Sequence, residues 1–434
     1  MRELLSAALL AALAVTNAAA ADWTQFLGSN PAFPTQLAEN GLAVDASGYV
    51  AVQTYNRLAW SGKIEFVHEY TLAADGNIPW IWGLVGRGAS EEMLPQGVAQ
   101  QDGRRLVWLT RTDNPWSIRD ELSLLSPNSS QPSLWLAEPR NDGRVTNVVS
   151  GGNDGAFALR LLDGGAGFEV IAFDGSYSRW RAALQPCAAG FEPRNLEMDY
   201  APATAWSGHP VLSVAGSCSD GITPAQVFVQ RFDAGHGLQG APEWIAAAAH
   251  NDLARLAFSP AHELVAIYDT PWPHKEVHRI GAPGSSYLPP DFLHGVDQVV
   301  ALAAGGDSLA IVGKNVAGDY AVASLTPFAP VPMARTLTGL AGFAGDGWTI
   351  AAGRDGKLLA MRVEPGASTS LLRLVGLDAY GLLEWTQTID DVVSGSQPQA
   401  VPAQDADGGF VVAVDKLAAT GTLGVHVQRV GSSP

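Results

Sequence analysis

Short apolar runs that flank turns rich in Gly and Asp dominate this chain. The unit is an apolar run, a turn and a second apolar run, and it recurs about eight times at intervals of roughly 40–60 residues. Two apolar runs joined by such a turn predict a β-hairpin. The clearest copies are Leu42–Val52, Val98–Leu109, Val148–Leu161, Val299–Val312, Leu340–Ala352 and Val401–Val414, and the weaker copies are Ala203–Val214 and Leu256–Ile267.

A second hairpin follows the first, and its last strand carries a Trp. Wide indole rings fill the wedge between sheets that are stacked around an axis, so these rings are expected to pack. Four strands per copy predict an all-β fold: a single β-propeller of eight blades, or seven as the alternative, with four-stranded antiparallel blades. The tryptophans are Trp80, Trp135, Trp180, Trp244 and Trp385.

The two ends of the repeat region complement each other. The final copy, Gln399–Val430, offers three strands, and the segment Asp22–Phe26 offers one strand without a hairpin partner. We therefore expect Trp23–Phe26 to pair with Val425–Val430 and to close the ring, which removes two free sheet edges. Residues 22–434 are then one propeller domain.

The first residues have the pattern of a signal peptide. Leu4–Val15 is apolar, and Ala18–Ala21 supplies the small residues of a cleavage site, so residues 1–21 are expected to be removed. The apolar run is shorter than the roughly 20 residues that a membrane-spanning helix needs. The expected location is outside the cell or in a bacterial periplasm, with no transmembrane segment.

Composition narrows the range of partners. Only 16% of the residues are charged and 47 are Gly, which suits many tight turns and buried strands. The net charge of −17 argues against binding nucleic acid or anionic lipid. It favours a soluble protein, expected to be a monomer, that meets neutral or cationic ligands.

Two cysteines, Cys187 and Cys218, are present. In an oxidising compartment an even pair predicts one disulfide, which would tie the third copy to the fourth. Two buried free thiols are the alternative.

Some of the repeats point to a known group. The runs Leu72–Trp80 and Leu377–Trp385 combine an Asp-containing turn with a closing Trp, and the Trp-x-x-Phe-x-Gly sequence that begins at Trp23 opens the repeat region. In these features the chain resembles the quinoprotein-like β-propellers, whose repeats are named after pyrroloquinoline quinone. The resemblance implies a propeller in the bacterial periplasm or outside the cell, with the non-catalytic branch favoured over the dehydrogenases.

The functional residues of that group are not carried over. Its enzymes have adjacent cysteines near the quinone, whereas Cys187 and Cys218 are far apart in the chain. Its non-catalytic members that act in outer-membrane assembly are lipoproteins, and the Cys that would carry the lipid is missing here.

One short segment has the residue types of a metal site. On a strand, His274, Glu276 and His278 point to the same face, and two imidazoles with a carboxylate are ligands that zinc accepts. The alternative is a solvated strand edge without a metal, flanked by Pro271 and Pro273. The Asp-rich turns lack the spacing of a calcium loop. No cofactor is therefore predicted, and a metal or a quinone is left open.

Two tryptophans, Trp116 and Trp272, lie outside the repeat register and beside prolines. Rigid exposed rings of this kind are typical interface anchors, so both are predicted to contact a ligand from rim loops. No nucleophile motif follows a strand and opens a helix. The favoured function is a binding module for a protein, peptide or glycan without catalysis. The alternative is an exported enzyme, either a quinoprotein-like oxidoreductase or a polysaccharide-active propeller.

Overall fold

The computed structural model describes most of the chain from residue 22 onward. The described residues are 22–431 except 29–32, 46, 58–62, 86–91, 102–103, 115–116, 126–131, 140–142, 152–154, 164–166, 174–177, 204–207, 221–225, 238–239, 246–251, 259–261, 270–274, 282–283, 288–295, 297, 306–307, 326–334, 344–346, 354–355, 367–368 and 404–408. The predicted signal peptide, residues 1–21, lies outside them.

Within these residues the fold is all-β, as predicted, and its strands form antiparallel sheets of four strands in sequence order. The first sheet contains β2 (Thr35–Val44), β3 (Val50–Arg57), β4 (Ile64–Leu72) and β5 (Trp80–Val85). The second contains β6 (Glu92–Gln101), β7 (Arg104–Asn114), β8 (Ser117–Leu125) and β9 (Pro132–Pro139). The third contains β10 (Gly143–Ser150), β11 (Ala156–Leu162), β12 (Phe168–Phe173) and β13 (Ser178–Leu184).

Three further sheets repeat this order. The fourth contains β14 (Glu192–Ala201), β15 (Val211–Ser219), β16 (Gln226–Asp233) and β17 (Glu243–Ile245). The fifth contains β18 (Asp252–Phe258), β19 (Leu264–Asp269), β20 (Lys275–Gly281) and β21 (Gly284–Tyr287). The sixth contains β22 (Gln298–Gly305), β23 (Ser308–Lys314), β24 (Tyr320–Leu325) and β25 (Arg335–Thr336).

The remaining eight strands are hydrogen-bonded into one larger sheet. It contains β26 (Thr349–Ala352), β27 (Leu358–Pro365), β28 (Ser370–Leu377), β29 (Leu383–Val392), β30 (Gln399–Pro402), β31 (Phe410–Leu417), β32 (Leu423–Val430) and β1 (Thr24–Leu27). Between its two halves, β26–β29 and β30–β32 with β1, the strand pairing in the described residues consists of Val392 with Lys416 in β29 and β31. We call the second half the last sheet.

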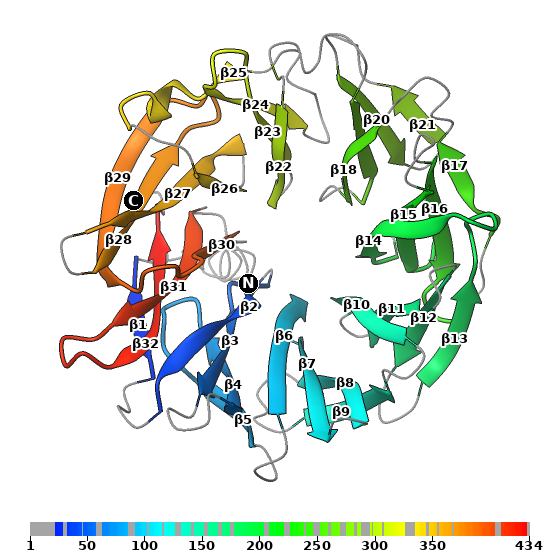
Figure 1. Cartoon of the computed structure of the whole chain (residues 1–434), viewed down its shortest axis with the longest axis horizontal. Coiled ribbons are helices and arrows are strands. Elements are labelled where there is room, and N and C mark those ends of the chain that lie inside the picture. Colours follow the sequence, from blue (N-terminus) through cyan, green and yellow to red (C-terminus); the bar gives the residue numbers. More distant parts are fainter. Residues whose placement is uncertain are drawn as a thin grey trace, which may run out of the picture.

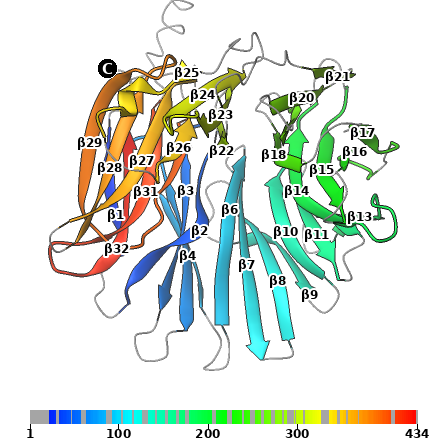
Figure 2. The ribbon, with the colours of Figure 1, turned by 45° about the horizontal axis from the view of Figure 1, so that its top comes forward.

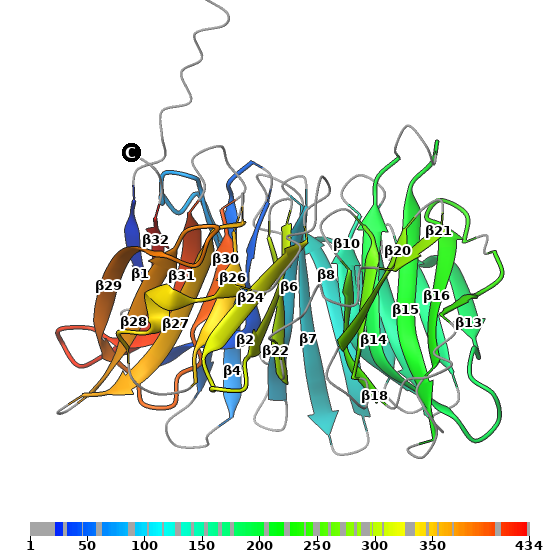
Figure 3. The same ribbon diagram turned by 90° about the horizontal axis from the view of Figure 1, so that it is seen from above.

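The sheets stand around a common centre, which is the arrangement of a β-propeller (Figure 1). The first strand of each sheet lies nearest the centre and the fourth lies at the periphery (Figures 1 and 2). Seen from the side, the strands run between the two faces of a disc (Figure 3).

Burial follows this radial order. The inner part of a sheet is covered by neighbouring sheets on both faces, so β11 is buried over five consecutive residues. The peripheral strand β13 instead alternates between half-buried and exposed positions. The distance of a strand from the centre therefore explains both patterns. Middle strands are continuous apolar runs, and outer strands alternate between more and less buried residues.

The predicted terminal pairing is present. Thr24 pairs with Gln428, and the antiparallel register continues to Leu27 opposite Val425. The N-terminal strand β1 thereby becomes the outermost strand of the last sheet, beside the first sheet (Figure 1). Leu27 is buried in a cluster that also contains Leu37 and Val52 of the first sheet.

The disulfide between Cys187 and Cys218 is also present, with 5.4 Å between the Cα atoms. Cys187 lies in the connection from the third sheet to the fourth, and Cys218 lies on β15. The bond therefore ties these two neighbouring sheets together, as the sequence predicts.

Two predicted hairpins are displaced. In the copy Ala203–Val214 the first strand ends earlier, at Ala201. In the copy Leu340–Ala352 the prediction is wrong. Leu340 belongs to a 3-10 turn, Thr338–Leu340, and the hairpin is instead β26–β27 around Gly356. Leu340 is buried in the core between the sixth sheet and strands β26–β28 without being part of a strand, which its apolar character alone does not reveal.

Among the described residues no helix has the length and apolar character needed to cross a bilayer.

Candidate functional site

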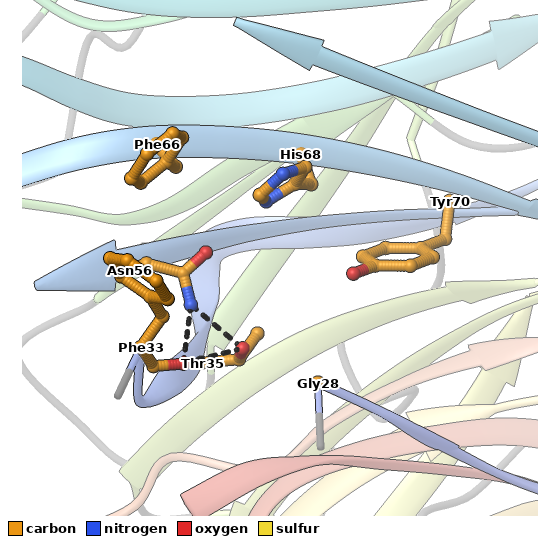
Figure 4. A pocket seen from close by; sticks show the side chains of 7 residues that line it. All are labelled: Gly28, Phe33, Thr35, Asn56, Phe66, His68 and Tyr70. Atoms are coloured by element: carbon orange, nitrogen blue, oxygen red, sulfur yellow. Dashed lines mark hydrogen bonds between the residues drawn. The ribbon is translucent and has the colours of Figure 1, made fainter. Parts of the chain in front are cut away.

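A pocket of about 400 Å³ lies where the last sheet meets the first (Figure 4). It is enclosed by β2, β3 and β4 on one side and by the end of β1 on the other. Its lining consists of aromatic and neutral polar residues. They are Gly28, Phe33, Thr35, Asn56, Phe66, His68 and Tyr70.

Three rings on β4 form one wall of this pocket. Side chains two residues apart on a strand share a face, so Phe66, His68 and Tyr70 all point toward the last sheet. Their centroids are spaced regularly: 6.1 Å from Phe66 to His68, and 6.1 Å from His68 to Tyr70. Phe33 meets Phe66 edge-on at 5.4 Å and extends the wall.

Beside this wall, the amide of Asn56 on β3 holds the start of β2. Its Nδ2 donates hydrogen bonds to the carbonyl oxygens of Phe33 (2.8 Å) and Pro34 (3.1 Å). It also donates to Thr35 Oγ1 at 2.8 Å (Figure 4). These bonds hold the residues that lead into β2. All three use Nδ2, and none of them involves Asn56 Oδ1.

Space for the pocket depends on a glycine. Gly28 follows β1 at a φ of +84°, a conformation that favours glycine. A Cβ at this position would lie 2.1 Å from Thr35 Oγ1, so any side chain here would collide with the start of β2.

The electrostatics of the pocket are those of a neutral site. Burial lowers the pKa of the His68 imidazole, which keeps the ring uncharged at neutral pH. Burial also raises the pKa of the Tyr70 phenol, so that group keeps its proton. His68 Nδ1 is buried without a hydrogen-bond partner among the described residues. The pocket therefore offers aromatic rings and uncharged hydrogen-bonding groups.

A second group of titratable side chains lies between the fourth and fifth sheets. His262 Nδ1 lies 2.8 Å from Asp199 Oδ2, and this hydrogen bond raises the pKa of the imidazole. Burial raises the pKa of Glu197, two residues before Asp199 on β14, to about 7. A carboxylate that orients an imidazole is a geometry suited to proton transfer.

Some of the site residues predicted from the sequence lie outside the residues that the structure describes. Trp116, Trp272 and His274 lie outside it, so their proposed roles stay predictions. Glu276 and His278 both belong to β20. The His278 ring is half-buried and meets the Tyr268 ring edge-on at 5.5 Å.

No group of three or more His, Cys, Asp or Glu side chains with metal-binding geometry is found in the part of the chain that the structure describes. The metal site at His274, Glu276 and His278 therefore stays a prediction. The two cysteines form a bond across 31 residues, unlike the adjacent cysteines of the quinoprotein enzymes.

Sequence reasoning missed the pocket. The alternation Phe66-x-His68-x-Tyr70 is as visible in the sequence as His274-x-Glu276-x-His278, and it marks one face of a strand rich in rings. What the sequence does not reveal is that the end of β1 lies opposite this face and leaves a gap.

Comparisons with known proteins bear on the fold alone. No protein-family model matches the chain. No curated protein matches its sequence. Solved structures that are similar include the WD40 domain of SCAP from fission yeast, with 9% identity, a TM-score of 0.49, and coverage of 95% of this chain and 98% of that one.

Another similar structure is the β-propeller domain of the Trilobed protease from Pyrococcus furiosus, with 10% identity, a TM-score of 0.44, and coverage of 79% of this chain and 94% of that one. The Myceliophteria thermophila Cps50 (Swd1) β-propeller domain has 9% identity, a TM-score of 0.38, and coverage of 95% and 100%. Likenesses this distant carry no information about a ligand or an activity.

Proposed function

We propose that this chain is an exported, eight-bladed β-propeller that binds a protein, peptide or glycan without catalysis. The observation that carries the binding role is the pocket between the last and first sheets, lined by aromatic and neutral polar side chains. Such a combination of ring faces and a few polar groups is typical of ligand sites.

The blade count rests on the sheet order. Six four-stranded sheets are accompanied by an eight-stranded sheet whose halves share one residue pair, Val392 and Lys416. Treating each half as a blade gives eight blades, and β1 closes the ring by completing the last one. Closure of this kind protects sheet edges that would otherwise pair with other chains.

Export is supported by two features. Residues 1–21 have the composition of a signal peptide. The bond between Cys187 and Cys218 is compatible with an oxidising compartment. We place the mature protein, residues 22–434, outside a bacterial cell or in its periplasm as a monomer.

The test of the binding role uses the mature chain on arrays of glycans and of peptides. We expect at least one class of probe to bind, and Phe66→Leu to weaken that binding while the melting temperature stays within a few degrees. Tyr380→Ala is the matched control, because Tyr380 is 63% exposed, lies in the turn between β28 and β29, and does not line the pocket. The proposed rim anchors are compared in parallel through Trp116→Ala and Trp272→Ala. Binding to neither array would contradict the proposal.

The alternative function, an exported propeller enzyme, is favoured by one observation, the pair of His262 and Asp199. Incubating the mature protein with neutral polysaccharides and measuring newly formed reducing ends tests the polysaccharide-active form. Turnover that is lost in His262→Gln, with the fold retained, would favour the enzyme. Unchanged substrates would favour the binding module.

A further inference from the structure

We infer that the pocket between the last and first sheets binds a neutral sugar ring of a glycan. This inference rests on the proposed binding function and narrows it to one ligand class. It is drawn from the size of the pocket, its ring faces, the hydrogen-bonding groups that remain free in it, and its lack of charge.

The size fits a small ring. A volume of about 400 Å³ lies near the lower end of the range of roughly 300–1,000 Å³ that is usual for small-molecule sites. One sugar ring, or one ring with part of its neighbour, suits a pocket of this size better than a long extended segment.

The rings supply a surface for the C–H faces of a sugar. An aromatic ring has a negative face, which attracts the slightly positive hydrogens on the apolar side of a pyranose. Phe66 and His68 both line the pocket, and their rings are nearly parallel, with an interplanar angle of 10° and centroids 6.1 Å apart. Tyr70 continues the wall with a hydroxyl at its tip (Figure 4).

The polar groups match hydroxyls. The Asn56 amide nitrogen is used to hold Phe33, Pro34 and Thr35, which leaves its oxygen as an acceptor toward a ligand. The Tyr70 hydroxyl both donates and accepts. Because sugar hydroxyls also do both, they can satisfy this mixed set, whereas an apolar peptide side chain would leave these groups unpaired at a cost in affinity.

The absence of charge in the lining decides between neutral and charged sugars. The seven lining residues include no Asp, Glu, Lys or Arg. A carboxylate or ammonium group placed here would be desolvated without an ionic partner, which is costly. The net charge of −17 further disfavours acidic ligands.

One residue outside the lining allows the site to be blocked selectively. Gly83 on β5 pairs with His68, and a Cβ built there lies 3.1 Å from His68 Cδ2 and 3.5 Å from Nε2. Gly83 is exposed, so a larger side chain at this position can reach over the imidazole without entering the core.

The experiment uses ligand-observed saturation-transfer NMR with the mature chain. The neutral probes are the methyl glycosides of glucose, galactose, mannose and N-acetylglucosamine. Glucuronic acid is the charged probe and N-acetyltyrosine amide is the peptide probe. We expect at least one neutral glycoside to bind and glucuronic acid to bind at least tenfold more weakly.

Four variants locate the binding. Phe66→Leu keeps apolar volume but removes a ring face, and His68→Phe keeps the ring but removes its nitrogens; each is expected to weaken neutral-glycoside binding roughly three- to tenfold. Gly83→Leu should weaken it as well, while Tyr380→Ala should leave it unchanged.

Two results would overturn the sugar assignment. If only the tyrosine amide binds, and Phe66→Leu weakens it, the binding function stands and the ligand class is wrong. If neutral glycosides bind but Phe66→Leu, His68→Phe and Gly83→Leu have no effect, the sugar site lies elsewhere. Failure of the binding function itself is read separately, from the glycan and peptide arrays.

Discussion

Two junctions between sheets share one contact and differ in what fills the space beside it. We call the boundary between the last and first sheets the terminal junction, and the boundary between the third and fourth sheets the disulfide junction. In the terminal junction, Trp23 Nε1 donates to the carbonyl oxygen of Ala74 at 2.9 Å. In the disulfide junction, Trp180 Nε1 donates to the carbonyl oxygen of Ala234 at 3.0 Å. Both acceptors lie in the turn that precedes the outermost strand of the next sheet.

Each of these indoles also lies against a glycine. A Cβ at Gly76 would come within 2.7 Å of the Trp23 ring, and a Cβ at Gly237 would come equally close to the Trp180 ring. Both glycines have positive φ values, +82° and +69°, a backbone conformation that favours glycine. Because glycine has no Cβ, each turn also leaves room for the indole ring.

Beyond this contact the junctions diverge. The disulfide junction is filled by stacked rings: Phe168 lies 5.9 Å from Phe228, and Trp180 lies 5.8 Å from Phe232. In the terminal junction the last sheet contributes Val425 and Val427.

In the terminal junction a pocket remains, and its lining combines the rings of β4 with Gly28, the residue that follows β1. The difference teaches that the docking of neighbouring sheets and the filling of the gap between them are separable. One junction is filled by rings, while the other keeps a pocket.

The largest expected effect comes from removing β1. A mature chain that begins at residue 28 loses the Trp23 hydrogen bond, the burial of Leu27 and the pairing with β32. We expect a loss of roughly 4–6 kcal/mol in the free energy of unfolding, and association through the exposed edge of β32. Urea unfolding and size-exclusion chromatography measure both.

Gln25→Ala is the control for this truncation, because Gln25 is only half-buried and the strand pairing is kept; its expected change is below about 0.5 kcal/mol. A truncated chain with the stability of the full mature chain would show that the terminal junction holds without β1.

The next effect concerns the disulfide junction. Replacing Cys187 and Cys218 together by Ala is expected to cost roughly 3 kcal/mol, because the unfolded chain gains the freedom of a 31-residue loop. Urea midpoints of the oxidised protein and the double variant give the value. Binding at the terminal junction should not change, and equal midpoints would show that the aromatic cluster alone holds this junction.

Trp23→Phe and Trp180→Phe form a matched pair. Each removes the hydrogen bond to a turn carbonyl and part of a packed ring, so we expect each to cost about 1–2 kcal/mol. Trp244→Phe serves as the reference, since Trp244 is 42% exposed on an outermost strand. Thermal unfolding compares the three. A much larger cost at Trp180 than at Trp23 would mean that the docking contact is not equivalent in the two junctions.

The smallest effect is a pH dependence at the terminal junction. The backbone N–H of Leu37 donates to Asp415 Oδ1 at 2.7 Å, but burial outweighs this bond and raises the pKa of Asp415 to about 6. The folded state therefore binds a proton before the unfolded state does, and stability rises as the pH falls from about 7 toward 5.

Asp415→Asn should remove about 1 kcal/mol of this rise, a value reduced for the partial exposure of the group. Urea unfolding at pH 7.5 and pH 5.0 measures it. The same pH dependence in the variant as in the parent would assign the rise to other carboxyl groups, such as Glu197.

Repetition made the fold predictable. The turn Asp378–Gly381 is an example. Asp378 Oδ1 accepts hydrogen bonds from the backbone N–H groups of Tyr380 and Leu382, so the residues of this short segment are enough to form the turn. The predicted tryptophans lie on outermost strands for the same reason, since each copy repeats its own order of strands. The terminal pairing followed from counting strands at both ends.

The pocket was not predictable in this way. It depends on Gly28, which follows β1, lying close to Thr35 and to the rings of β4, and these segments meet only in the folded chain. The same limit explains the error at Leu340, whose burial comes from a neighbouring sheet and not from a strand of its own.

The pairing of β1 with β32 also sets an order of events during synthesis. Thr24 and Gln428 lie roughly 400 residues apart, so the first strand to leave the ribosome must wait for the last. Until then β1 is a short segment without its strand partner, and the pocket lacks the side that Gly28 supplies. The junction between the last and first sheets thus stays incomplete until β32 is available, and the pocket beside it cannot take its final shape before then.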